Sequence, residues 1–493
     1  MQKLILRKEP NYTQKKTAFD FQMRAEIFAE NLEYCGIFHE QGLGKTKIAL
    51  DLSLKWFLKR EIDTVLIVTK KSLISNWINE VTEHTFLKPK IISQNLLQNS
   101  YIFNSPTRMI ICHYEVFPNE VERIKLFCKS RNVAIILDEA TKIKNPDSQI
   151  SKSFIDLSKY FTKRIIMTGT PVANRPFDIW ALIFFLDNGK SLGNNFNDFK
   201  KDTDLNNELY NNRDQQNRYE DTLKSIYTKI SSFCIRETKL GSNIELPKKN
   251  YIKVDCDWEY NQRDMYEQIV NEMRLVVQKN GKLEFDDSSV VLKRILRLIQ
   301  VTSNPTLIDS NYKNEPGKIT NLIYLVDEII QKNEKVIIWT NFIENVNYLY
   351  HILSEFKPLR VYGKLSIDDR NEAIYKFKND ESRKILIATP ASAKEGLTLT
   401  VANHAIFLDR NLSLDDYLQS QDRIHRISQK KECYIYDFIM KDSIDEWVDA
   451  LIESKHYSAK LLQNDISLDE YNKNVNYDYS LIFKNILNGG NNE

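Results

Sequence analysis

The chain has 493 residues, which at roughly 150 residues per domain corresponds to about three domains, or to two large ones with an insertion. Apolar residues make up 42% of it and charged residues 28%, an ordinary composition for a folded globular protein that excludes wholesale disorder. The 69 Lys and Arg residues nearly balance the 67 Asp and Glu residues, for a net charge of +2, so any affinity for nucleic acid must come from local basic clusters.

Neither the cysteines nor the apolar runs point to an extracellular or membrane protein. The six cysteines include no CxxC pair, so we expect reduced thiols rather than disulfides or structural zinc. Charges flank a very short apolar stretch at Met1 to Lys8, which is not the pattern of a signal peptide. The longest apolar runs are far too short to cross a bilayer. We therefore expect a cytoplasmic protein.

Continuous apolar runs recur in both halves of the chain and alternate with segments of helical periodicity. They lie at 64–68, 109–112, 133–137 and 164–167, and again at 335–339, 384–388, 405–408 and 434–436. Runs without polar alternation are typical of strands buried on both faces of a parallel sheet. We expect an α/β protein with two parallel-sheet lobes, at 15–190 and 315–465.

The segment between these lobes, 191–314, has a different composition. Residues 201–222 are nearly all polar, and residues 259–301 carry apolar side chains at helical spacing. We expect a mostly helical insertion and linker there. After the second lobe, residues 466–493 form a polar tail rich in Asn and Asp, whose end at 488–493 we expect to be frayed.

A glycine-containing loop follows the short apolar run Cys35 to Phe38 and precedes a helical pattern. This arrangement suits a triphosphate, because backbone N–H groups and the helix N-terminus point at the phosphate oxygens. Lys45 would reach the β and γ phosphates, and the Thr46 hydroxyl would ligate Mg²⁺. His39 stands where the usual eight-residue pattern begins with Gly. The expected nucleotide-binding residues of the loop are Gly42, Leu43, Gly44, Lys45 and Thr46.

An acidic pair, Asp138 and Glu139, directly follows the apolar run 133–137, where a parallel sheet presents ligand groups. Asp138 can hold Mg²⁺ through water, and Glu139 can orient and deprotonate an attacking water. Alone, the pair could be solvated acids that open a helix. Together with the glycine loop it predicts a nucleoside triphosphatase lobe. Gln22, upstream of the loop, has an amide that can read an adenine edge.

Further motifs follow in order through both lobes: Gln22; Gly42 to Thr46; Ser72 to Glu80; Tyr114-Glu115; Asp138 to Asn145; Thr168 to Asn174; Val336 to Phe342; Tyr362-Gly363 with Arg370 and Phe377; Glu395 to Leu399; and Gln419 to Gln429. With them the chain, over roughly 15–465, resembles the Swi/Snf-type DNA-dependent ATPases of helicase superfamily two. The resemblance implies two RecA-like lobes with ATP and Mg²⁺ in the cleft between them. It also implies that Arg423 and Arg426 act as arginine fingers and that Gln419 lines the same cleft. The expected catalytic residues are therefore Lys45, Asp138, Glu139, Gln419, Arg423 and Arg426.

The sequence departs from the family pattern at a few positions near these motifs. The departures are Thr141 for His, Ala173 for a frequent Gln, Glu237 for the second Arg of the linker, Leu412 to Leu414 for Trp-Asn-Pro, and Ser428 for Gly. With these departures we still expect ATP hydrolysis. They affect the residues that would couple hydrolysis to movement along DNA.

The resemblance also implies that nucleic acid contacts strand ends on both lobes. Hydroxyls, amides and N–H groups there would bind phosphates without reading base sequence. The candidates are Lys70, Lys71, Trp77 and Tyr114 in the first lobe, and Thr340, Asn341, Ser392, Lys394 and Gly396 in the second. The alternative role for Trp77 is core packing, and for the two lysines it is simple solvation.

The leading hypothesis is a monomeric, ATP-driven translocase on double-stranded DNA, from a bacterial, phage or viral source. A protein partner could supply its target. One alternative is a strand-separating or annealing helicase, although no wedge hairpin is recognisable in the second lobe. Others are an ATP-gated nucleic-acid binding module and a remodeller of RNA or of RNA polymerase.

Overall fold

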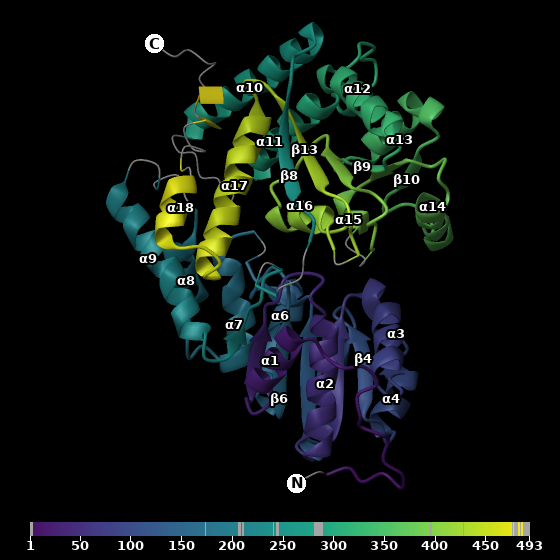
Figure 1. Cartoon of the computed structure of the whole chain (residues 1–493). Coiled ribbons are helices and arrows are strands. Elements are labelled where there is room, and N and C mark those ends of the chain that lie inside the picture. Colours follow the sequence, from purple (N-terminus) through teal and green to yellow (C-terminus); the bar gives the residue numbers. More distant parts are fainter. Residues whose placement is uncertain are drawn as a thin grey trace. The chain divides into compact units, whose positions relative to one another are not determined.

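The computed structural model of the chain (Figure 1) describes residues 3–172, 174–205, 209, 212–239, 241–242, 246–280, 289–393, 397–426, 428–475, 477, 482–483 and 485–486. It divides into two compact units. The first unit comprises 1–204, 216–244 and 458–471, and the second comprises 205–215, 245–457 and 472–493.

The first unit is built on a seven-stranded sheet with the strand order β3-β4-β2-β5-β6-β1-β7. Its strands are β1 (Tyr34–Ile37), β2 (Thr64–Thr69), β3 (Lys90–Ile91), β4 (Met109–His113), β5 (Val133–Asp138), β6 (Lys163–Met167) and β7 (Cys234–Ile235). Each described pair is parallel. Every residue of β2, β4 and β6 is buried, which explains their continuous apolar sequences.

The helices up to residue 230 are α1 (Asp20–Ala29), α2 (Lys45–Leu58), α3 (Ile74–His84), α4 (Leu96–Asn104), α5 (Val121–Ser130), α6 (Gln149–Leu157), α7 (Ile179–Asp187), α8 (Phe196–Thr203) and α9 (Arg213–Ile230). One core cluster joins α1, α2 and α3 to one face of the sheet, with Ile48, Trp77 and Ile136 among its members. Helix α7 contacts β1 and β6. The sheet is thus buried between helices, as its apolar runs require.

The second unit is built on a six-stranded parallel sheet with the strand order β10-β11-β9-β12-β13-β8. Its strands are β8 (Lys249–Cys256), β9 (Val336–Trp339), β10 (Leu359–Val361), β11 (Ile385–Ala388), β12 (His404–Phe407) and β13 (Cys433–Met440). The apolar runs predicted as strands in both halves are all strands of the two sheets. The predicted α/β fold with two parallel-sheet lobes is confirmed.

The later helices are α10 (Tyr260–Asn280), α11 (Ser289–Ser303), α12 (Gly317–Gln331), α13 (Ile343–Ile352), α14 (Ile367–Asn379), α15 (Pro390–Ala393), α16 (Leu414–Gln421), α17 (Ile444–Leu462) and α18 (Leu468–Asn474). Two core clusters lie on opposite faces of the second sheet. Helices α12 and α13 contribute to one of them, and α14 contributes Phe377 to the other. Side-chain oxygens of Ser366 and Ser413 cap the N-termini of α14 and α16.

The segment predicted as a helical insertion, 191–314, is divided between the two units. It is largely helical, but β7 joins the first sheet beside β1 and β8 joins the second sheet beside β13. In the predicted tail, Tyr471 on α18 is fully buried, whereas 488–493 lie outside the described residues. In the part of the chain that the structure describes, no helix has the length and apolar character needed to cross a membrane.

Candidate active site

The glycine loop lies between the end of β1 at Ile37 and the start of α2 at Lys45. Gly42 and Gly44 have φ angles of 89° and 68°, in the left-handed region where a side chain is disfavoured. The Lys45 ammonium donates to the carbonyl oxygens of His39 at 2.8 Å and Glu40 at 3.2 Å. The predicted strand, loop and helix are therefore present, with the lysine folded over the loop.

Gln22 lies against this loop, as the motif order predicts. Its Oε1 accepts a hydrogen bond from the Phe19 N–H at 2.9 Å, and its Nε2 donates to the Leu43 carbonyl at 3.3 Å. A Cβ on Gly44 would stand 2.3 Å from the Gln22 Nε2, at the end of a flexible side chain, so it is the left-handed φ that favours glycine there. The Gln22 amide thus ties helix α1 to the loop.

The acidic pair stands at the end of β5. The Asp138 Oδ2 accepts hydrogen bonds from the Thr69 hydroxyl at 3.0 Å and the Trp77 indole N–H at 2.8 Å, and its carbonyl accepts one from the Tyr114 hydroxyl at 2.8 Å. Burial raises the pKa of Asp138, and the charge of Glu139 adds to that effect. The two side-chain hydrogen bonds oppose the rise, so they favour the ionised form.

Lys45 lies within electrostatic reach of both acids. Burial lowers the pKa of Lys45, and the charges of Glu139 and Asp138 partly restore it. Glu139 has a left-handed backbone, with φ of 52° and ψ of 50°. Within the described part of the chain its Oε2 is buried and has no hydrogen-bond partner. This oxygen therefore keeps an unfilled acceptor position at the end of β5.

Thr46 and Asp138 fit the demands of Mg²⁺. A hydroxyl and a carboxylate are the hard oxygen donors that this ion binds beside phosphate groups. The two described hydrogen bonds to the Asp138 carboxylate both fall on Oδ2, and none among the described residues falls on Oδ1. Asp138 can therefore bind a hydrated ion without giving up its protein contacts.

The Thr168 to Asn174 motif also meets the loop. A Cβ on Gly169 would stand 2.8 Å from the Gln41 Cγ and 3.4 Å from the Lys45 Nζ. Asp178 binds both the Asn174 N–H, at 2.9 Å, and the Lys144 ammonium, at 3.1 Å. The segment after the acidic pair is thereby tied to this motif, although the departure Thr141 is buried and Ala173 lies outside the described residues.

A contact that the sequence did not predict closes the base of the loop. Arg236, just after β7, donates through Nη1 to the Phe38 carbonyl at 2.8 Å. Its Nε and Nη2 bind the two carboxylate oxygens of Asp465 at 2.6 and 2.5 Å. Both residues belong to the first unit and are 229 positions apart, so no local pattern could have indicated the pair.

The second unit holds the remaining predicted catalytic residues. Gln419 is buried, and its Nε2 donates to the Asp415 carboxylate at 2.7 Å. Arg423 is 3% exposed and donates to the Leu397 carbonyl at 3.4 Å. The half-buried Arg426 donates to the Thr398 hydroxyl at 2.9 Å. The two arginines thus share the 397–398 segment, and Arg423 does not lie on an exposed helix face.

The structure separates the predicted nucleic-acid residues of the first unit into two classes. Lys70 is half-exposed and Lys71 exposed at the end of β2. Trp77 and Tyr114 are 1% and 0% exposed, so their prediction as backbone contacts is wrong. Core packing, the alternative for Trp77, is what the structure shows, and the polar atoms of both side chains hold Asp138 instead.

A similar correction applies in the second unit. Ser392 is buried, and its hydroxyl donates to the Thr389 carbonyl at 2.7 Å. The fully buried Thr340 donates to the Asp409 carboxylate at 2.5 Å, so neither hydroxyl faces solvent. Asn341 is half-buried, and both its N–H and its side-chain amide bind Asp409. Lys394 and Gly396 lie outside the described residues.

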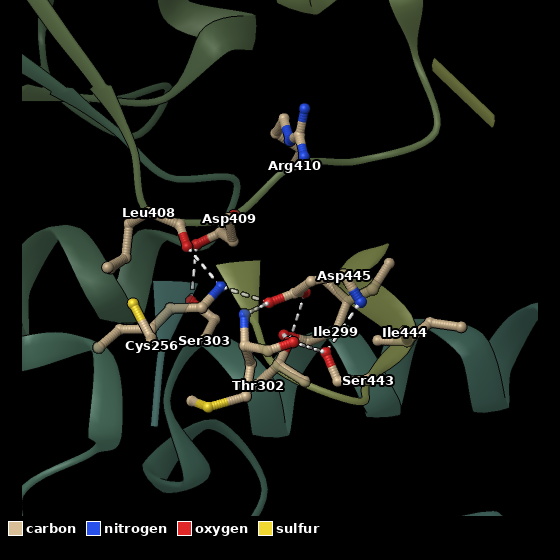
Figure 2. Close-up of polar contacts among 12 residues, drawn as sticks. Cys256, Ile299, Thr302, Ser303, Leu408, Asp409, Arg410, Ser443, Ile444 and Asp445 are labelled. Atoms are coloured by element: carbon tan, nitrogen blue, oxygen red, sulfur yellow. Dashed lines mark hydrogen bonds and ion pairs between the residues drawn. The ribbon is translucent and has the colours of Figure 1, made fainter. Parts of the chain in front are cut away.

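Asp409 is one centre of a buried polar network (Figure 2). Besides Thr340 and Asn341, it binds the Ser303 hydroxyl at 2.7 Å, at the end of α11. The neighbouring Thr302 donates to Asp445 at 2.8 Å. Asp445 also pairs at 2.6 Å with the Lys318 ammonium, which donates to the Leu408 carbonyl as well. The network fixes the ends of β9, β12 and α11 together.

Two family models together match most of the segment that contains the ATPase motifs. One described as "SNF2-related domain" matches residues 28–307, more than half of the chain, and one described as "Helicase conserved C-terminal domain" matches residues 317–428. The chain belongs to the SNF2 family. It is a Swi/Snf-type member of helicase superfamily two, and the resemblance predicted from its motifs is confirmed.

The chain spans less than half the length of the curated relatives it matches. A Mycoplasma pneumoniae protein named "Uncharacterized ATP-dependent helicase" is 29% identical over 87% of this chain and 40% of its own length. The human "SWI/SNF-related matrix-associated actin-dependent regulator of chromatin subfamily A member 1" is 26% identical over 89% of this chain and 43% of its own. The solved "Sulfolobus solfataricus SWI2/SNF2 ATPase core in complex with dsDNA" is 24% identical and covers 96% of this chain and 99% of that chain, with a TM-score of 0.42.

Proposed function

We propose that this chain is an ATPase stimulated by nucleic acid that moves along double-stranded DNA. The observation that carries the proposal is the grouping of Lys45, Asp138 and Glu139 at one end of a parallel sheet, in a chain with both halves of a helicase core. The names of its relatives, an ATP-dependent helicase and a chromatin regulator, agree with it.

The first unit supplies nucleotide binding and the attacking water. The loop N–H groups and the Lys45 ammonium would bind the phosphates, while Gln22 holds the loop and its amide would read the adenine edge. Thr46 and Asp138 would hold Mg²⁺, which when bound neutralises charge on the terminal phosphates. The free Oε2 of Glu139 accepts a proton from the water and orients it.

The second unit supplies the cations that complete the site. We propose that Arg423 and Arg426 reach the transferring phosphoryl group when the two units close on the nucleotide, with Gln419 beside them. Closure on binding and opening after hydrolysis would change the grip on DNA once per cycle. Lys70, Lys71 and Asn341 remain the described candidates for that grip, and Lys394 and Gly396 stay proposed contacts.

Comparison of activators tests the proposal. ATP hydrolysis is measured with double-stranded DNA, single-stranded DNA, RNA and no nucleic acid, beside the Lys45→Ala protein. We expect stimulation that is strongest with double-stranded DNA and falls steeply with added salt, and no turnover in Lys45→Ala. Triplex displacement without fork unwinding would distinguish a translocase from a strand-separating helicase. Turnover in Lys45→Ala equal to the unaltered protein would contradict the site, and stimulation by RNA alone would replace DNA as the track.

We also propose that the protein acts as a monomer in the cytoplasm of a bacterial, phage or viral system and that a protein partner supplies its target. The six free, buried cysteines and the Mycoplasma relatives support this setting. Sedimentation velocity at the concentrations used for hydrolysis measures the oligomeric state.

A further inference from the structure

Three segments of the first unit converge on Asp138. Thr69 is the last residue of β2, Trp77 lies in α3, and Tyr114 follows β4. Thr69 and Trp77 both donate to the same carboxylate oxygen, Oδ2, while Tyr114 donates to the backbone carbonyl of Asp138. Helix α3 also contacts β4, beside which Figure 1 shows it. Asp138 is therefore held by donors from three separate elements.

The two donors to Oδ2 stand at the two ends of one short segment, residues 70–76. This segment carries Lys70 and Lys71, and it also exposes Ser72, Ser75 and Asn76. It is anchored by Leu73, which is buried in the core cluster that contains Trp77. Cations, hydroxyls and amides that project from such a segment can bind a nucleic-acid phosphate. Any displacement of the segment must act on Thr69, on Trp77, or on both.

We infer that Thr69 and Trp77 are positioning residues that couple phosphate binding at residues 70–76 to the placement of the Asp138 carboxylate. The inference rests on the proposed nucleic-acid-dependent ATPase function and assigns how nucleic acid stimulates it. Two donors on one oxygen fix the rotation of the carboxylate and direct Oδ1 away from them. A phosphate that tightens the segment tightens both hydrogen bonds, which holds Oδ1 where the nucleotide's hydrated cation binds.

Core packing alone does not account for the Trp77 contact. Trp180, in α7 of the same unit, is 5% exposed, and among the described residues its buried indole nitrogen has no hydrogen-bond partner. This fold therefore tolerates a buried indole N–H that binds no other described residue. The Trp77 nitrogen instead lies 2.8 Å from the one carboxylate oxygen that the Thr69 hydroxyl also binds. The pair thus offers a matched comparison of two buried indoles.

The test measures coupling between two ligands, in addition to activity. Coupling is reciprocal, so the factor by which double-stranded DNA tightens Mg²⁺-ATPγS binding equals the factor by which the nucleotide tightens DNA binding. Both dissociation constants are measured for the unaltered protein, Trp77→Phe, Thr69→Val and the control Trp180→Phe. Each substitution at Asp138's donors removes one hydrogen bond and keeps most of the side-chain volume. Circular dichroism checks that each variant is folded.

We expect DNA to tighten nucleotide binding on the order of tenfold in the unaltered protein and in Trp180→Phe. In Trp77→Phe and Thr69→Val the coupling factor between DNA and nucleotide should fall to about two or less. The DNA-stimulated kcat should fall roughly tenfold or more, while the KM for DNA should change less than about threefold. A KM effect with kcat retained would instead mean that the segment only binds DNA, and the inference would be wrong.

The result can be separated from failure of the proposed function. If no nucleic acid stimulates the unaltered protein, the proposed function itself fails. If DNA stimulates it and Trp77→Phe keeps the full coupling factor, only the inference fails. Equal loss of coupling in Trp180→Phe would also overturn the inference, because the effect would then come from loss of any buried indole. If Trp77→Phe does not fold, Thr69→Val decides the question alone.

Discussion

Asp465→Asn removes the negative charge that pairs with Arg236, whose guanidinium also binds the Phe38 carbonyl just before the glycine loop. Arg236 would lose a bidentate carboxylate while remaining only 12% exposed, and would keep its bond to the Phe38 carbonyl and a weaker ion pair with Glu40 at 3.9 Å. Breaking a buried ion pair typically costs about 3–5 kcal/mol, because the remaining charge has no compensation. Since both side chains keep some solvent contact and Glu40 still faces the Arg236 guanidinium, we expect a smaller loss, about 1–2 kcal/mol, in the unfolding free energy of the first unit.

Urea denaturation followed by circular dichroism measures this loss, and equilibrium binding measures nucleotide affinity. The matched control is Glu83→Gln, which breaks the ion pair with Lys16 on the same unit, where the side chains are 50% and 55% exposed. That change should cost less than about 1 kcal/mol. Equal effects of the two substitutions would refute the reasoning. So would unchanged nucleotide affinity in a destabilised Asp465→Asn, because the Arg236–Asp465 pair would then not act on the loop.

Glu139→Gln removes the carboxylate that we propose orients the attacking water. The DNA-stimulated rate should fall by about 100-fold or more while nucleotide affinity, measured by equilibrium binding, stays within about threefold. Arg426→Ala should lower the rate by a factor on the order of 1,000 with nucleotide binding kept, and a normal rate would contradict its role. Burial, and then the charge of Lys45, lowers the pKa of His39 from 6.5 to about 3. The unfolded state therefore binds more protons below pH 6.5, so urea stability should fall by about 2 kcal/mol from about pH 7.5 to about pH 5, and His39→Asn should show a shallower slope. Lys318→Met leaves Asp445 buried without its cation and should cost about 3–5 kcal/mol, whereas Lys332→Met, at an exposed pair with Glu328, should stay within about 0.5 kcal/mol.

Most strands could be predicted because burial on both faces leaves a continuous apolar sequence. Strand β8 could not, since it lies at the edge of the second sheet and its central residues are exposed. Its sequence, Lys249 to Cys256, mixes charged, polar and apolar residues, and nothing in it marks pairing with β13 nearly 200 residues away. Edge strands often lack the continuous apolar sequence of central strands, because only one of their two long edges pairs with another strand.

The residues of the glycine loop were predictable because the loop depends on local backbone geometry. Gly44 has a left-handed φ, and the need for glycine at such a position is visible in the sequence. The errors at Trp77 and Tyr114 have a different origin. Residue type does not report depth, and an indole beside a strand end serves equally for stacking on a ligand or for donation to a buried carboxylate. The Trp77 partner lies 61 positions away, beyond any local pattern.

The pair of Arg236 and Asp465 also sets an order of assembly during synthesis. Arg236 leaves the ribosome 229 residues before Asp465, which at about 5–20 residues per second is a delay of roughly 10–45 s. Over that time the nascent first unit has all seven strands of its sheet but lacks the anion that steadies its phosphate loop. By the time this anion emerges, Arg423 and Arg426 have already been made. The Arg236–Asp465 pair can therefore form only after the chain also contains Arg423 and Arg426.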